Sequence, residues 1–215
     1  MAKPKLPQKG TKIEYLGGVE IRSGKLTAQH TAAPRDSAKI KYIVLHYAGV
    51  PGLSAQRLCE RFVATTQAKS THYTVDEDEV WRVCADEYAA WHCGLKAGAN
   101  YKHPKARNDN ALGVDLCERR VAATSGSVYA ADWYFPAETI ARAVELVAAL
   151  CCRYNLDPRD AVLRHYDVTG KICPAPWAGN VISSVTGQRR EEDWRDFKRA
   201  VVERAQSMSE DGAQK

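Results

Sequence analysis

Residues 40–46 have the sequence IKYIVLH, a run of β-branched and aromatic side chains that stops at a histidine. Such a run is typical of a central strand. Ala48 and Gly49 follow and predict a turn, so His46 is expected at the end of this strand. An imidazole is a good ligand for Zn²⁺, and an apolar strand that ends in one marks His46 as a candidate ligand.

Other predicted elements alternate along the chain on either side of a long loop over residues 85–109. Strands are expected at 72–75, 79–83, 112–117 and 162–164, and helices at 54–66, 136–154 and 191–206. Interleaved strands and helices predict a single α/β domain in which helices flank a central mixed β-sheet.

The length and composition set the domain organisation. A chain of 215 residues with 45% hydrophobic and 27% charged residues is enough for one soluble domain with tails. We expect a basic N-terminal extension over residues 1–37, extended except for a short strand at 19–21. The domain is expected over residues 38–206, followed by a flexible tail over 207–215.

Neither a membrane span nor a secretory signal is expected. No apolar run approaches the roughly 20 residues that a membrane helix needs, so membrane insertion is not predicted. Residues 1–10 are basic but no apolar stretch follows them, which predicts synthesis in the cytoplasm without a signal peptide. Action on a cell wall would then follow release or non-classical export.

Basic residues are concentrated at the start of the chain. Residues 1–41 contain nine lysines and arginines and three acids, a local charge of +6, within a total of +5. Such an arm can bind nucleic acid or an anionic polymer such as a cell wall, or it can simply be a solvated leader. The sequence alone leaves these alternatives open.

The cysteines indicate reduced thiols. There are seven, an odd number, with no CxxC pair. This pattern argues against a disulfide framework, and one of the cysteines can still be a metal ligand.

Residues 165–176 (HYDVTGKICPAP) give the strongest chemical signal. His165 follows a predicted strand and Cys173 lies eight residues later, beyond a loop that contains Gly170. Imidazole nitrogen and thiolate sulfur are good zinc ligands, and catalytic zinc sites use three protein ligands with one position kept for water. Each histidine alone would be interpreted as structural, but together with Cys173 they predict a zinc site of His46, His165 and Cys173.

Five motifs occur in an order that resembles a known family. They are IVLHYAG at 43–49, STHYTV at 70–75, AWHCG at 90–94, NALGVDLC at 110–117 and the segment from His165 to Cys173. The sequence resembles the N-acetylmuramoyl-L-alanine amidases, zinc amidases related to phage T7 lysozyme and to peptidoglycan recognition proteins. The resemblance covers residues 38–178 and is greatest to endolysin and prophage amidases of Gram-positive bacteria.

The resemblance implies an activity and a site. The zinc, held by the same three residues, would lie in a surface groove that accepts a glycan-linked peptide. The bond cut would join N-acetylmuramic acid to L-alanine of the peptidoglycan stem peptide. Lys171 matches the family lysine beside the metal, which would stabilise the oxyanion.

A carboxylate is needed to move the proton of the attacking water. The endolysin relatives usually have glutamate in the matching strand, and this chain has the shorter Asp115. Alternation along the strand places Gly113, Asp115 and Cys117 on one face, so Asp115 can face the groove. Glu118 is expected on the opposite face.

Further residues are expected near the substrate. Trp91 and His92 resemble the family's groove wall, where they would contact sugar or peptide. Asn110 is expected to position the substrate backbone, and His72 to contact the substrate or support the site.

Three alternative functions remain in view. A non-catalytic peptidoglycan receptor of the same fold is less favoured because such relatives typically lose the zinc cysteine, and Cys173 is present. A nucleic-acid-binding zinc protein would need close-spaced ligand pairs that this chain lacks. A cytoplasmic amidase that recycles muropeptides stays open. We expect a monomer whose partner is peptidoglycan.

Overall fold

A seven-stranded mixed sheet forms the centre of the computed structural model, which describes residues 11–24, 31–95, 99–121 and 127–213. The strand order is β1-β2-β6-β5-β8-β4-β11. β5, β8, β4 and β11 run parallel to one another, β6 is antiparallel to β5, and β2 is parallel to β6. The predicted α/β domain with a central mixed sheet is confirmed.

The strands are short, as the sequence predicts. Those of the central sheet are β1 (Lys12–Leu16), β2 (Val19–Ser23), β4 (Tyr42–Tyr47), β5 (Tyr73–Val75), β6 (Val80–Arg82), β8 (Ala111–Leu116) and β11 (Val162–Arg164). Two small ribbons pair β3 (Thr31–Pro34) with β7 (Tyr88–Ala90) and β9 (Arg119–Arg120) with β10 (Trp133–Tyr134).

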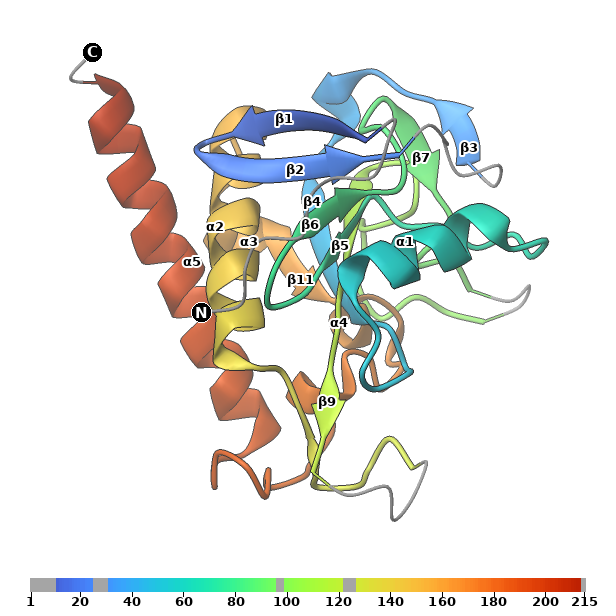
Figure 1. The fold of residues 1–215 in the computed structure, drawn as a ribbon, viewed down its shortest axis with the longest axis vertical. Coiled ribbons are helices and arrows are strands. Elements are labelled where there is room, and N and C mark those ends of the chain that lie inside the picture. Colours follow the sequence, from blue (N-terminus) through green and yellow to red (C-terminus); the bar gives the residue numbers. More distant parts are fainter. Residues whose placement is uncertain (1–10, 25–30, 96–98, 122–126, 214–215) are drawn as a thin grey trace.

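Helices cover both faces of the sheet (Figure 1). α2 (Ala137–Tyr154) packs on one face of the sheet, and α5 (Arg190–Ala213) packs against the outer side of α2. α1 (Ala55–Ala64) packs on the other face of the sheet. Two short helices, α3 (Pro158–Ala161) and α4 (His165–Thr169), flank β11. None of the helices in the described ranges has the length and apolarity needed to cross a membrane.

Alternation along β4 and β8 divides their side chains between two environments. Ile43 and Leu45 of β4 lie in the core under α2, with Leu112, Val114 and Leu116 of β8. Val44 and His46 therefore point to the opposite face. His46 is paired in register with Asp115 near the carboxyl ends of the two strands. Both candidate site residues therefore lie side by side at the carboxyl ends of the central strands.

The N-terminal segment differs from the expected extension. Residues 12–23 form the hairpin of β1 and β2, and β2 pairs with β6. Gly17 and Gly18 both have positive φ angles, 55° and 86°, as a two-residue hairpin turn requires. Val19 and Ile21 are buried in the core, so this hairpin belongs to the sheet. The rest of the predicted basic arm, residues 1–10 and 25–30, lies outside the described residues.

The C-terminal helix is longer than expected. α5 continues to Ala213, so the prediction of a flexible tail from residue 207 is wrong for residues 207–213. The extra turns form because Met208 packs against the core and the Ser209 hydroxyl donates to the Ala205 carbonyl. Residues 214–215 lie outside the described residues.

Candidate metal centre

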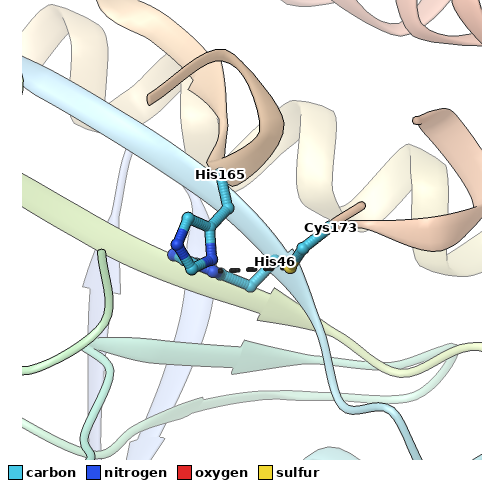
Figure 2. A group of neighbouring side chains, drawn as sticks. All are labelled: His46, His165 and Cys173. Atoms are coloured by element: carbon cyan, nitrogen blue, oxygen red, sulfur yellow. Dashed lines mark hydrogen bonds between the residues drawn. The ribbon is translucent and has the colours of Figure 1, made fainter. Parts of the chain in front are cut away.

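Three buried side chains converge where β4 and β11 end. His46 belongs to β4, His165 follows β11 directly as the first residue of α4, and Cys173 lies in the loop after α4. Their exposed fractions are 4%, 6% and 3%. Their ligand atoms all lie within 4.8 Å of one another, and Figure 2 shows the two rings and the thiol facing one another. The structure thus brings together the three residues that the sequence predicts as ligands.

The segment between His165 and Cys173 turns back on itself, so that the two residues lie side by side. Gly170 ends α4 with a φ of 82°, a left-handed conformation that favours glycine. The Tyr166 amide then donates to the Cys173 carbonyl at 2.9 Å. Nearby, the buried Arg164 guanidinium bonds both carboxylate oxygens of Asp167 and the Trp177 carbonyl. These bonds fix the backbone on both sides of the two ligands.

The donor atoms have the hydrogen-bonding pattern of a metal site. His46 Nδ1 lies 3.7 Å from Cys173 Sγ. The Nδ1 atom of His165 is buried and has no hydrogen-bond partner among the described residues. Buried polar atoms normally have partners, so this nitrogen fits a site whose remaining partner is a cation.

Burial decides the protonation of the three groups. Desolvation lowers the pKa of His46 well below its ordinary value, and lowers the pKa of His165 to about 4. Both rings are therefore neutral at pH 7 and have a lone pair for a metal. Burial raises the pKa of the Cys173 thiol to about 12, and nearby Asp115 adds to this effect. A bound divalent cation would reverse this shift, because coordination favours the thiolate.

The ligands line a cavity of about 220 Å³. Asp115 borders it, and burial raises the pKa of its carboxyl to about 6. A carboxyl with a pKa near neutrality is suited to accept a proton and return it. Glu118, as predicted, does not border this cavity, and its carboxylate instead accepts the Ala48 amide at 2.9 Å.

Two lysines and an indole also line the cavity. Lys171, a predicted site residue, lies beside the ligands together with Lys69, and Trp91 lies on the wall with 44% of its surface exposed. No sequence motif singles out Lys69. Its only signal is its position directly before the motif at 70–75, because a lysine in a loop has no distinctive pattern.

The other predicted contact residues occupy different environments. His92 borders the cavity, but its two ring nitrogens lie 3.0 Å from His46 Nε2 and 3.4 Å from the Ala111 carbonyl. His72 is fully buried outside the cavity, and its Nδ1 accepts the Gly113 amide. Both imidazoles thus have protein partners; His92 still lines the cavity, whereas His72 is placed to support the site from behind.

Asn110 is placed away from the cavity. It precedes β8, whereas the site lies where that strand ends. Its side chain accepts the Arg107 amide and donates to the Lys105 carbonyl. The structure therefore does not bring Asn110 to the cavity, and its side chain braces the loop before β8 by satisfying backbone groups.

The chain matches a protein-family model over residues 36–176, most of its length, and that model is described as N-acetylmuramoyl-L-alanine amidase. The chain belongs to the N-acetylmuramoyl-L-alanine amidase family. The match begins and ends close to the limits 38–178 that the motifs predict, and it includes all three candidate ligands of this family member.

Curated relatives of this amidase-family chain have the same family name. It is 34% identical over 172 residues to the N-acetylmuramoyl-L-alanine amidase CwlL of Bacillus licheniformis, covering 77% of this chain and 44% of the relative. It is 31% identical over 150 residues to the amidase BlyA of Bacillus subtilis (strain 168), covering 66% and 38%. The chain thus spans less than half the length of these relatives.

Solved structures share the fold of this family member. The PlyG catalytic domain aligns with a TM-score of 0.62 and 20% identity, over 87% of this chain and 96% of that one. The catalytic domain of XlyA aligns with a TM-score of 0.60 and 20% identity, over 85% and 99%. At this identity the likeness concerns the fold alone.

Proposed function

We propose that this protein is a zinc-dependent amidase that cleaves the bond between N-acetylmuramic acid and L-alanine in peptidoglycan. One observation carries the proposal: His46, His165 and Cys173 place their donor atoms within 4.8 Å beside the Asp115 carboxylate, in a chain of the amidase family. Two imidazoles and a thiolate that leave one position free form the ligand set of a catalytic zinc site.

The residues around the metal position have separate roles in this proposal. A zinc ion bound there would supply a nucleophilic water at neutral pH and polarise the scissile carbonyl. Asp115 accepts the proton of the attacking water and returns it to the leaving amine of L-alanine. The Lys171 ammonium stabilises the negative charge that develops on the carbonyl oxygen.

The same cavity indicates the substrate. Trp91, half-exposed on its wall, offers an apolar surface for a sugar or peptide group, and Lys69 adds a second positive charge. These features suit a glycan-linked stem peptide, which contains carboxylates. We propose that the protein acts as a monomer on the cell wall, as an endolysin or autolysin, without binding nucleic acid or inserting into a membrane.

Digestion of purified sacculi tests the activity. We expect new L-alanine amino groups to appear with the wild-type protein, and to disappear after chelation or with His46→Ala. Cys173→Ser should also be inactive, whereas Cys152→Ser is a matched control because Cys152 is exposed on α2 and should keep full activity. Release that survives both chelation and His46→Ala would refute the zinc amidase proposal.

The same assay separates the alternatives. A protein that binds sacculi and zinc but releases no amino groups would be a receptor of this fold. A protein that cleaves soluble muropeptides but not sacculi would be a recycling amidase. Either result would replace the proposal of a wall-lytic enzyme.

A further inference from the structure

The His92 ring lies between a candidate ligand and a backbone carbonyl. Its Nδ1 is 3.0 Å from His46 Nε2, and its Nε2 is 3.4 Å from the Ala111 carbonyl oxygen. The rings of His46 and His92 meet edge to face, with centroids 5.1 Å apart and planes at 89°. A single side chain therefore connects His46 to strand β8.

The carbonyl group determines the direction of both hydrogen bonds. A carbonyl oxygen can only accept, so the Nε2 atom of His92 must carry hydrogen. Among the described residues neither ring has a carboxylate as a hydrogen-bond partner, and an enclosed imidazolium without a counter-charge is costly, so both rings are neutral. A neutral imidazole has one N–H group, which makes Nδ1 of His92 an acceptor. His46 must then donate from its own Nε2.

The consequence for His46 is a lone pair on Nδ1. This atom lies 3.7 Å from Cys173 Sγ, on the side of the ring where the other candidate ligands lie. The hydrogen bond made by one nitrogen of a histidine determines which nitrogen is free for a metal. We propose that His92 is a positioning residue, which holds His46 as the Nε2–H tautomer so that Nδ1 binds the metal.

The surrounding residues are arranged to admit the ring. A Cβ atom at Gly113 would lie 2.9 Å from His92 Cγ and 3.0 Å from its Nδ1, so only glycine lets the ring pass this close to β8. The Asn108 side chain accepts the backbone amides of His92 and Cys93 at 3.1 and 2.8 Å. The backbone of His92 is thus fixed by Asn108, and its ring packs against the backbone of β8 at Gly113.

This inference rests on the metal site of the proposed function, but it does not depend on peptidoglycan cleavage. The His92 side chain does not touch the metal or the substrate in this role. Loss of such a supporting hydrogen bond typically weakens metal binding by about 10–100-fold. Zinc affinity and the tautomer of His46 are therefore the quantities to measure.

The first experiment is a Zn²⁺ titration of the full chain against a competing chelator. His92→Phe keeps the volume of the ring but removes the acceptor, and should weaken Zn²⁺ binding about 10–100-fold. His92→Asn keeps a carbonyl acceptor and should recover part of this loss. The control is Tyr88→Phe, because Tyr88 is a half-exposed aromatic residue of β7, shortly before His92 in the sequence. This variant should bind Zn²⁺ as tightly as the wild type.

The second experiment is a long-range ¹H–¹⁵N spectrum of the histidine rings in the metal-free full chain. We expect hydrogen on Nε2 of His46 in the wild type, and a mixture of both tautomers in His92→Phe. The proposal would be overturned by a wild-type His46 protonated at Nδ1, or by His92→Phe binding Zn²⁺ with unchanged affinity. If His92→Phe does not fold, the wild-type spectrum and the Zn²⁺ affinity of His92→Asn test the proposal instead.

These measurements are independent of the amidase assay. A wild-type protein that binds Zn²⁺ through His46 Nδ1 but cleaves no sacculi would refute the amidase proposal and still support the role of His92. A protein that cleaves sacculi but coordinates through Nε2 of His46 would do the reverse.

Discussion

Replacing Gly113 with alanine would place a methyl group between β8 and the His92 ring. The new Cβ would lie 2.8 Å from Thr71 Oγ1 and 2.9 Å from His92 Cγ. Ordinary contacts between carbon atoms are about 3.5–4.0 Å, so the ring would have to retreat by roughly 0.5–1 Å. The ring would move away from β8 and out of its present position beside His46.

The expected effect on stability is the difference of two terms. Overpacking a buried site costs about 1–3 kcal/mol, whereas alanine in a strand is about 0.5–1 kcal/mol more favourable than glycine. We therefore expect Gly113→Ala to lower the free energy of unfolding by about 1 kcal/mol, within a range of roughly 0–2.5 kcal/mol. The 3.0 Å bond between His46 and His92 would also lengthen beyond hydrogen-bonding distance, which weakens Zn²⁺ binding.

Urea unfolding and a Zn²⁺ titration measure these two effects. Gly24→Ala is a matched control because a Cβ there meets nothing within 4 Å, so its stability and Zn²⁺ affinity should be unchanged within about 0.5 kcal/mol. If Gly113→Ala were as stable as the wild type and bound Zn²⁺ equally well, the close approach of His92 to β8 would have no energetic role.

Three further predictions concern catalysis, pH and the C-terminus. Asp115→Asn should lower the rate of amino-group release from sacculi by about 10²–10⁴-fold while Zn²⁺ binding persists, and full activity would exclude Asp115 from proton transfer. Burial lowers the pKa of His72 from 6.5 to about 3, so the folded state binds fewer protons than the unfolded state between these values. The free energy of unfolding should therefore fall by about 1.4 kcal/mol per pH unit as the pH drops through this window. In His72→Asn the free energy of unfolding, measured with urea, should fall less between pH 7 and pH 5 than in the wild type. An equal fall in both proteins would contradict the lowered pKa of His72. Removal of residues 207–215 takes away the packing of Met208 on the core and should lower the free energy of unfolding by about 1 kcal/mol, whereas an unchanged melting temperature would show that this packing is not stabilising.

The central strands and the three clustered candidate ligands could be predicted because their signals are local. An apolar run that ends in His46 indicates both a strand and its end, and the two-residue period of β8 predicts the face of Asp115. The type of side chain at His165 and Cys173 already limits the chemistry. Convergence then follows from the parallel arrangement of β4 and β11.

The remaining features depend on tertiary contacts that no short pattern carries. The hairpin at 12–23 has charged side chains and only two buried apolar ones, Val19 and Ile21, so its alternation is weak. The position of His92 depends on the absence of a side chain at Gly113, which is distant in the sequence and adjacent only after folding. The family resemblance suggested a substrate contact for His92, and its hydrogen bonds indicate a supporting role.

The hairpin at the sheet edge also determines where the domain can be cut. The family match begins at residue 36, but β2 covers the outer edge of β6 and buries Ile21. A protein that begins at residue 36 would lack β1 and β2. It would expose the backbone hydrogen-bonding groups of β6, beside the apolar side chains of Val80 and Trp81. Uncovered edges of this kind pair with other chains. With the hairpin present, the outermost strand on this side among the described residues is β1, whose Lys12 and Glu14 place charges along the edge and so discourage aggregation between molecules.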